Sequence, residues 1–174
     1  MVRGVEISLQ SDNTRMVSAE LSYTYLDAVY TKHNPFKQFD DYTTRTAYSV
    51  YNINGNEIPR VSKHTADLFI NYKPTADIKI VTELFARSDY WADERNKLKM
   101  DGYELVNLQA RYYIQSGENE LELYAKVDNL LDDQYYRAAF VHSDKRAPIG
   151  VDKDDISITV DPGRVYYAGV KYRF

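Results

Sequence analysis

The chain has 174 residues, enough for one structural unit and few for two. Its formal net charge of −4 and its isoelectric point near 5.4 provide no basic field, so we expect no nucleic-acid partner. The absence of cysteine excludes disulfides, thiolate nucleophiles and cysteine-ligated zinc.

Seven stretches alternate apolar and polar residues, the pattern of β-strands. They span residues 2–10, 14–30, 64–73, 76–91, 102–115, 119–130 and 163–174. In the first stretch, for example, Val5 and Ile7 flank Glu6. The 31 alternate positions on the apolar face in the alternating parts of these stretches include no charged residue, although 28% of the chain is charged. A helical period competes only around 121–131, so the sequence predicts an all-β antiparallel meander of about seven strands.

The connections between these stretches alternate in length. Short turns occupy 11–13, 74–75 and 116–118, whereas longer connections span 31–63, 92–101 and 131–162. Successive connections of a meander lie at opposite ends of the sheet, so all the short turns share one end. This asymmetry is typical of transmembrane β-barrels of the outer membrane. A lipid-facing strand needs apolar residues only at alternate positions, which accommodates a mean hydropathy of −0.57.

An open seven-stranded sheet leaves two edge strands unpaired, which lipid does not tolerate. We therefore expect the seven strands to form part of a large transmembrane β-barrel that closes with strands this chain does not contain. The 17 tyrosines suit a membrane interface, where a side chain has an apolar body and a wet tip. No secretory signal follows Met1, so an export signal is expected upstream.

Two segments near the end of the sequence form a recognisable pair. The first, 126–136, reads KVDNLLDDQYY, and the second, 162–174, reads PGRVYYAGVKYRF. They resemble the end of TonB-dependent outer-membrane receptors, where an Asn-Leu-hydrophobic-Asp element and a following tyrosine precede a Gly-Arg strand ending in an aromatic residue. Similarity at 4–6, 58–61 and 102–112 extends the resemblance over nearly the whole chain.

The resemblance implies a 22-stranded barrel filled by a plug domain, of which residues 1–174 are the carboxy-terminal segment. The plug, the TonB box and the earlier strands are then absent from this chain. The implied protein is a receptor of the bacterial outer membrane that takes up a scarce nutrient without converting it. The expected nutrient is a ferric siderophore, with haem, cobalamin and other metal chelates as alternatives.

The resemblance also implies a set of partners. These are outer-membrane lipid, the missing plug and amino-terminal strands, the TonB complex through the absent plug, the outer-membrane assembly machinery and a metal-chelate substrate. Catalytic motifs are missing from the sequence, so we expect neither an enzyme nor a cofactor.

Candidate substrate contacts lie in the last long connection, because aromatic rings and cations at a loop mouth can hold a polar chelate. They are Tyr135, Tyr136, Arg137 and His142. His142 could ligate haem iron, although a lone loop histidine is usually solvated. Arg137, Lys145 and Arg146 could attract an anionic ferric siderophore, unless nearby acids cancel their charge.

The terminal stretch carries a second candidate site. Val170, Tyr172 and Phe174 are predicted to form the signal that outer-membrane assembly machinery recognises, since an unpaired edge strand is a template for strand addition. The alternative is a lipid-facing strand end whose aromatics belong to the membrane girdle.

Other polar residues are assigned structural roles. Asn129 is expected to satisfy backbone groups where its strand ends, and Arg164 to pair with Glu122 or Asp128. The run at 152–155 is interpreted as a solvated acidic loop rather than a calcium site, and no metal site is predicted. The charges on the polar face are interpreted as hydrated wall and plug contacts: Glu6, Glu20, Asp67, Lys79, Glu83, Arg87, Arg111, Lys126, Lys171 and Arg173.

A soluble β-sandwich or small barrel that binds a ligand is the alternative from another class. A buried face and a lipid face have the same period, so alternation alone does not separate the two. The asymmetry of the connections and the terminal aromatic residue favour the membrane. An outer-membrane enzyme, for which the sequence has no motif, ranks third.

Overall fold

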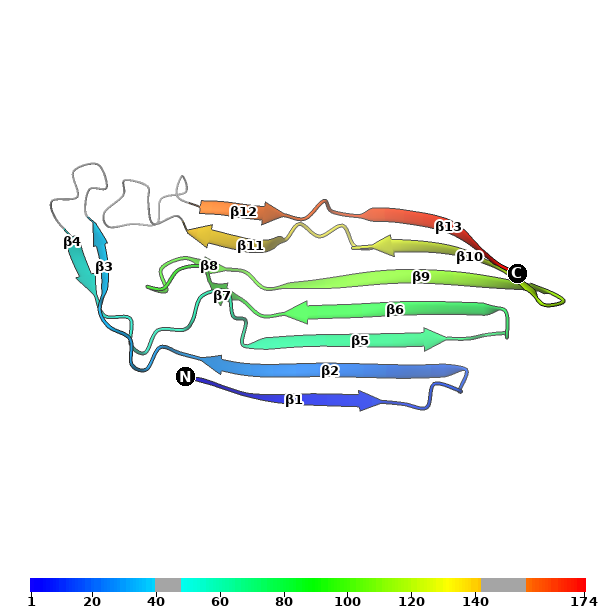
Figure 1. Ribbon diagram of the computed structural model, residues 1–174, viewed down its shortest axis with the longest axis horizontal. Helices are drawn as coiled ribbons and strands as arrows, with labels where there is room; N and C mark the ends of the chain where they lie inside the picture. Colours follow the sequence, from blue (N-terminus) through cyan, green and yellow to red (C-terminus); the bar gives the residue numbers. More distant parts are fainter. Residues whose placement is uncertain (40–47, 142–155) are drawn as a thin grey trace.

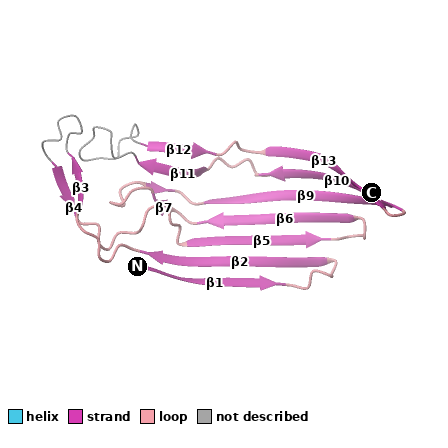
Figure 2. Ribbon diagram, viewed as in Figure 1, coloured by secondary structure: helices cyan, strands magenta, loops and turns pink. Residues whose placement is uncertain are grey.

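The computed structural model describes residues 1–39, 48–141 and 156–174, a part of the chain whose regular elements are β-strands (Figure 2). Seven long strands form one antiparallel sheet: β1 (Val2–Gln10), β2 (Val17–Ala28), β5 (His64–Tyr72), β6 (Ile78–Arg87), β9 (Tyr103–Ser116), β10 (Asn119–Asp128) and β13 (Val165–Arg173). They lie side by side in chain order, so the sheet is a meander (Figure 1). Within these ranges, no helix of sufficient length and apolarity to cross a membrane is found.

Each of the seven predicted stretches coincides with one of these strands, with β9 ending one residue beyond its predicted stretch, which confirms the predicted fold class. Figure 1 also confirms the predicted asymmetry, because the short turns lie at one end of the sheet and the long connections at the other. The predicted stretch at 76–91 is interrupted. β6 ends at Arg87, and a separate strand, β7 (Tyr90–Trp91), follows after two residues.

Each long connection contains a short hairpin that the sequence analysis did not predict. The hairpins are β3 (Phe36–Phe39) with β4 (Tyr48–Tyr51), β7 with β8 (Lys99–Met100), and β11 (Tyr136–Val141) with β12 (Ile156–Val160). The β11–β12 hairpin extends beyond the ends of β10 and β13 (Figure 1). We call the three long connections with their hairpins the cap.

The register joins the uncharged faces of the strands into one continuous face. Leu68 of β5 lies between Leu21 of β2 and Leu84 of β6. Leu84 lies in turn opposite Val106 of β9. A slip of one residue would move every side chain of a strand to the opposite face. The register is therefore well defined only if the two faces of the sheet contact different environments.

The uncharged face is not packed against a second layer. Val5, Leu9 and Val170 on this face keep 57%, 60% and 68% of their surface exposed. The largest buried apolar cluster of the described residues lies instead in the cap, where Tyr90 and Met100 meet Ala139. A soluble sandwich would need a second sheet over the uncharged face, and the described residues form no such sheet.

Both edges of the sheet are open. β1 pairs only with β2, and β13 only with β10, among the described strands. Every residue of β1 is exposed. An open sheet with one uncharged, exposed face is what the sequence predicts for part of a barrel wall, and it is not a self-sufficient globule.

Candidate functional site

A polar hollow of about 330 Å³ lies on the charged face of the sheet, where β6, β9, β10 and β13 approach the cap. Its wall combines strand residues with residues of the last long connection. Its polar side chains include Glu83, Asn107, Lys126, Tyr135, Arg137 and Asp161. The hollow therefore joins the inner face of the sheet to the region where the sequence predicts substrate contacts.

The two cations of the hollow are both paired with carboxylates. Arg137 Nη2 lies 2.9 Å from Asp161 Oδ2, and Lys126 Nζ lies 2.7 Å from Asp128 Oδ1. The Asp161 side chain is nearly buried, whereas that of Arg137 is largely exposed. The charge of Arg137 is thus largely cancelled, as the sequence analysis allowed for this residue.

Tyr135 is the aromatic centre of the hollow. Its ring lies 4.3 Å from the ring of Tyr103, which is itself 5.7 Å from the ring of Phe85. Burial, followed by the neighbouring Asp161 carboxylate, raises the pKa of the Tyr135 hydroxyl to about 12. The phenol therefore stays neutral at physiological pH and acts as a hydrogen-bonding group rather than as an anionic ligand.

The side chain of Asn129 closes the end of β10 by hydrogen bonding to both backbone groups of Asp133. Its side-chain oxygen accepts a hydrogen bond from the Asp133 N–H at 3.0 Å, and its side-chain N–H donates to the Asp133 carbonyl at 2.8 Å. Its own backbone N–H donates to Asn107 Oδ1 at 2.8 Å. Asn129 has a φ of 53° and is 2% exposed. The predicted structural role of Asn129 is confirmed.

The two segments that carry the family resemblance touch each other. Asp132 Oδ1 accepts a hydrogen bond from the backbone N–H of Arg164 at 2.9 Å. Gly163, next to Arg164, has a φ of 81°, and a Cβ there would lie 3.2 Å from the same carboxylate oxygen. Asp132 itself has a φ of 62°. The Asn-Leu-Leu-Asp element and the Gly-Arg strand therefore form one local structure, which explains why they occur together.

The predicted ion pair of Arg164 is wrong. Glu122 pairs with Arg111 at 3.2 Å, and Asp128 pairs with Lys126. The register explains the difference, because Asp128 lies opposite Val165 and Glu122 lies opposite Lys171, farther along β13.

The structure brings together two of the four predicted substrate contacts. Tyr135 and Arg137 line the hollow. Tyr136 does not line it, is 49% exposed and lies opposite Val160 in the β11–β12 hairpin. His142 lies outside the described residues, as do Lys145, Arg146 and the run at 152–155.

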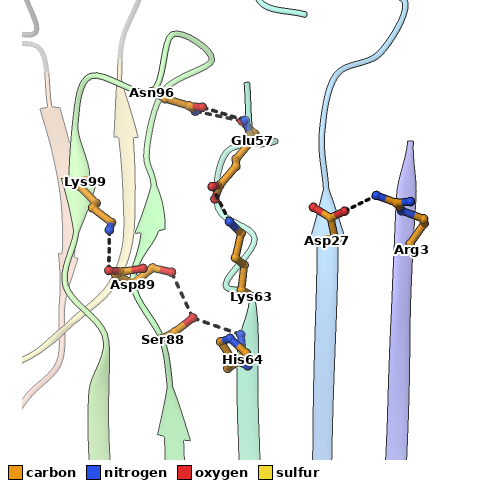
Figure 3. A network of polar contacts seen from close by, with 9 residues as sticks. All are labelled: Arg3, Asp27, Glu57, Lys63, His64, Ser88, Asp89, Asn96 and Lys99. Atoms are coloured by element: carbon orange, nitrogen blue, oxygen red, sulfur yellow. Dashed lines mark hydrogen bonds and ion pairs between the residues drawn. The ribbon is translucent and has the colours of Figure 1, made fainter. Parts of the chain in front are cut away.

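Hydrogen bonds and side-chain packing link the three long connections of the cap. Asn96 exchanges two hydrogen bonds with the backbone of Glu57, at 2.7 and 3.0 Å (Figure 3). Glu57 also pairs with Lys63 at 2.7 Å, and the ribbon in Figure 3 shows these contacts above the ends of the long strands. Ala139 of β11 packs against Tyr90 of β7. The cap is thus one packed assembly beside the hollow.

The sequence analysis missed three arginines, two in the cap and one at the end of β6 beside it, that stack on aromatic rings. They are Arg60, Arg87 and Arg95. Arg87 had been assigned to the hydrated wall. The stacking partners of Arg60 and Arg95 are Phe140 and Tyr51, which are far away in the sequence, whereas Arg87 stacks on the nearby Tyr90 and on Tyr103.

A single antiparallel sheet with one exposed uncharged face, short turns at one end and a packed cap at the other is the wall of an outer-membrane type of β-barrel. A family model described as TonB dependent receptor-like, beta-barrel matches residues 1–130, and the chain belongs to this family. The predicted family is thereby confirmed.

Individual relatives agree with this assignment. The chain is 26% identical over 139 residues to a probable TonB-dependent siderophore receptor, PiuA, of Acinetobacter baumannii, which covers 80% of this chain and 18% of the relative. The crystal structure of PiuA from the same species matches with a TM-score of 0.75 and 22% identity, over 99% of this chain and 22% of that one. The structure of BauA, its ferric preacinetobactin receptor, matches with a TM-score of 0.70 and 20% identity, over 98% and 22%. The structural matches show the fold, and the chain spans less than a quarter of each relative.

Proposed function

We propose that this chain forms part of the wall of a receptor in the bacterial outer membrane that imports a ferric siderophore in a TonB-dependent manner. Family membership, together with the exposed uncharged face of the sheet, carries this proposal. The relative PiuA is described as a probable siderophore receptor, and BauA as the ferric preacinetobactin receptor.

The partners follow from the two faces and the two edges of the sheet. The uncharged face contacts outer-membrane lipid, and the charged face contacts water and a plug domain. The open edges of β1 and β13 pair with further barrel strands, so that residues 1–174 supply the carboxy-terminal segment of a larger barrel. The TonB complex acts through the plug. Nothing is converted chemically in this scheme, so the protein is a transporter and not an enzyme.

The substrate is bound from the cap side of the barrel. Tyr135 and Arg137 are the proposed contacts in the hollow, with Tyr136 and His142 on the same long connection. The neutral Tyr135 phenol offers an aromatic face and a hydrogen-bonding oxygen, which suits the aromatic and oxygen-rich surface of a metal chelate.

Replacing Tyr135 with alanine in the complete receptor is expected to weaken binding of its ferric siderophore by roughly fivefold, the loss of one aromatic contact of about 1 kcal/mol. Binding of a panel of ferric siderophores to the purified receptor measures this, and uptake of radiolabelled iron by cells with and without TonB tests transport. Tyr112→Ala, on the uncharged face, is the control. A receptor that binds and imports no ferric siderophore would contradict the proposal.

We also propose that Val170, Tyr172 and Phe174 form an assembly signal. All three lie on the same face of the open edge strand or at its end, and Phe174 is 98% exposed. Phe174→Ala is expected to lower the amount of folded receptor in the outer membrane several-fold, as seen by heat-dependent gel mobility. Tyr166→Ala removes another exposed aromatic from β13. An equal loss in both variants would indicate a membrane girdle instead of a signal.

A further inference from the structure

The arginines of the described ranges divide into two groups. Five have a carboxylate within 4.0 Å: Arg3, Arg15, Arg111, Arg137 and Arg173. The other four have no such partner in the part of the chain that the structure describes: Arg164, just before β13, Arg60 and Arg95 in the cap, and Arg87, at the end of β6 beside the cap. At the cap, Arg60, Arg87 and Arg95 therefore carry positive charge that no carboxylate of the described residues pairs with.

Aromatic rings take the place of carboxylates around these arginines. The Arg60 guanidinium lies 4.9 Å from the ring centre of Phe140, and that of Arg87 lies 4.8 Å from Tyr90 and 5.6 Å from Tyr103. A guanidinium that stacks by its face keeps its N–H edge available for an anion. Arg87 uses two of these donors on Ser62 Oγ, and no hydrogen bond is found for the Arg60 side chain among the described residues.

Arg60 and Arg87 converge on Tyr90. Burial raises the pKa of the Tyr90 hydroxyl, and the charges of Arg87 and Arg60 oppose that shift. The hydroxyl is close to the Ala139 amide, but it forms no well-aligned hydrogen bond with the described residues. Among the described residues, two guanidiniums without a carboxylate partner thus lie near one buried phenol, and the oxygen of that phenol has no well-aligned hydrogen bond.

The backbone also holds this group in place. Arg60 has a φ of 64°, which is rare for a residue with a side chain, and its N–H donates to the Trp91 carbonyl at 2.7 Å. On the other side, Tyr103 connects Arg87 to Tyr135, which lines the hollow. The group is therefore fixed in position and adjacent to the proposed binding site.

Taking the proposed transport function as given, we propose that Arg60 and Arg87 select the charge of the substrate, which is a ferric chelate with a net negative charge. An anionic chelate supplies oxygen acceptors to the remaining N–H groups of these guanidiniums through charge-assisted hydrogen bonds. The same charges steer an anion toward the cap. Arg137, which the sequence analysis selected for this role, is already paired with Asp161.

The test compares two probes on the complete purified receptor: a ferric tris-catecholate, which is a polyanion, and a ferric tris-hydroxamate, which is neutral. The receptor is expected to prefer the polyanion, and the double variant Arg60→Gln, Arg87→Gln to bind it roughly a hundredfold more weakly, from two lost charge-assisted contacts. Affinity for the neutral chelate stays unchanged. Arg15→Gln, in the turn at the opposite end of the sheet, is the matched control.

Each outcome distinguishes this inference from the transport proposal. Equal affinity for both probes, or an unchanged affinity for the polyanion in the double variant, overturns the charge-selection role and leaves siderophore uptake standing. Failure to bind or import any ferric chelate overturns both. Arg60→Lys, Arg87→Lys retains the charge, so it should preserve much of the preference. If the double glutamine variant fails to fold, as judged by heat-dependent gel mobility, the exposed Arg60→Gln change alone must still reduce binding of the polyanion.

Discussion

Replacing Leu84 with arginine is expected to lower the free energy of unfolding of the lipid-embedded barrel by about 2–4 kcal/mol more than Leu84→Ala does, whereas Leu84→Ala loses only the transfer free energy of three carbon groups, about 2 kcal/mol. Leu84 lies in the middle of the uncharged face, between Leu68 and Val106, and remains 37% exposed in this chain. A lipid chain fills the space that a shortened side chain leaves, but it cannot solvate a guanidinium. Urea unfolding of the receptor in vesicles measures both effects.

The ratio of the two costs is the informative quantity. In a packed protein core, Leu→Ala alone costs about 2–5 kcal/mol, because a cavity remains. Gln109→Arg, on the opposite face of the neighbouring strand β9, is the matched control and should be nearly neutral. A cost for Leu84→Ala well above about 2 kcal/mol, as large as that of Leu84→Arg, would indicate a cavity in a packed protein core and would contradict the membrane assignment.

Replacing Asn129 with alanine is expected to cost about 2–4 kcal/mol of stability, from two lost hydrogen bonds and a left-handed backbone that alanine adopts poorly. Asn129→Gly keeps the backbone free of strain and loses only the side-chain bonds to Asp133, so it should lie between alanine and the wild type. Thermal unfolding of the three proteins gives the order. Asn119→Ala, at the other end of β10, serves as the control.

An unchanged stability in Asn129→Ala would mean that water replaces the asparagine amide at Asp133. If Asn129→Gly is no more stable than Asn129→Ala, backbone strain at this position does not contribute to the loss of stability. Because Asn129 N–H also bonds Asn107, whose side chain donates to Glu83 Oε2 at 3.0 Å, the alanine variant is further expected to loosen the wall of the hollow.

The sheet could be predicted because each strand has two different environments. Alternation such as Val5, Glu6, Ile7 needs only local sequence, and the short turns fix which strands are neighbours. The cap hairpins were missed because they are short and irregular. In the β11–β12 hairpin, the register shifts between Tyr136 and Ala138, so the residues on either side no longer follow one alternation.

The site was only partly predictable, since its electrostatics depend on distant residues. Tyr135 and Arg137 were identified by residue type, but the neutralisation of Arg137 depends on Asp161, which follows it by 24 positions. That Arg60 and Arg87 have no carboxylate partner among the described residues is likewise a property of their neighbours in space. No local pattern in the sequence reports the absence of a carboxylate.

The central claim is that the uncharged face of the sheet contacts lipid. The chain has no cysteine, so single cysteines can be placed along β6 in the complete receptor and labelled with a nitroxide. In vesicles, labels at positions 80, 82 and 84 should be relaxed strongly by dissolved oxygen and weakly by a water-soluble metal complex. Low accessibility of these positions to both agents would place them inside a packed protein core and would contradict the account.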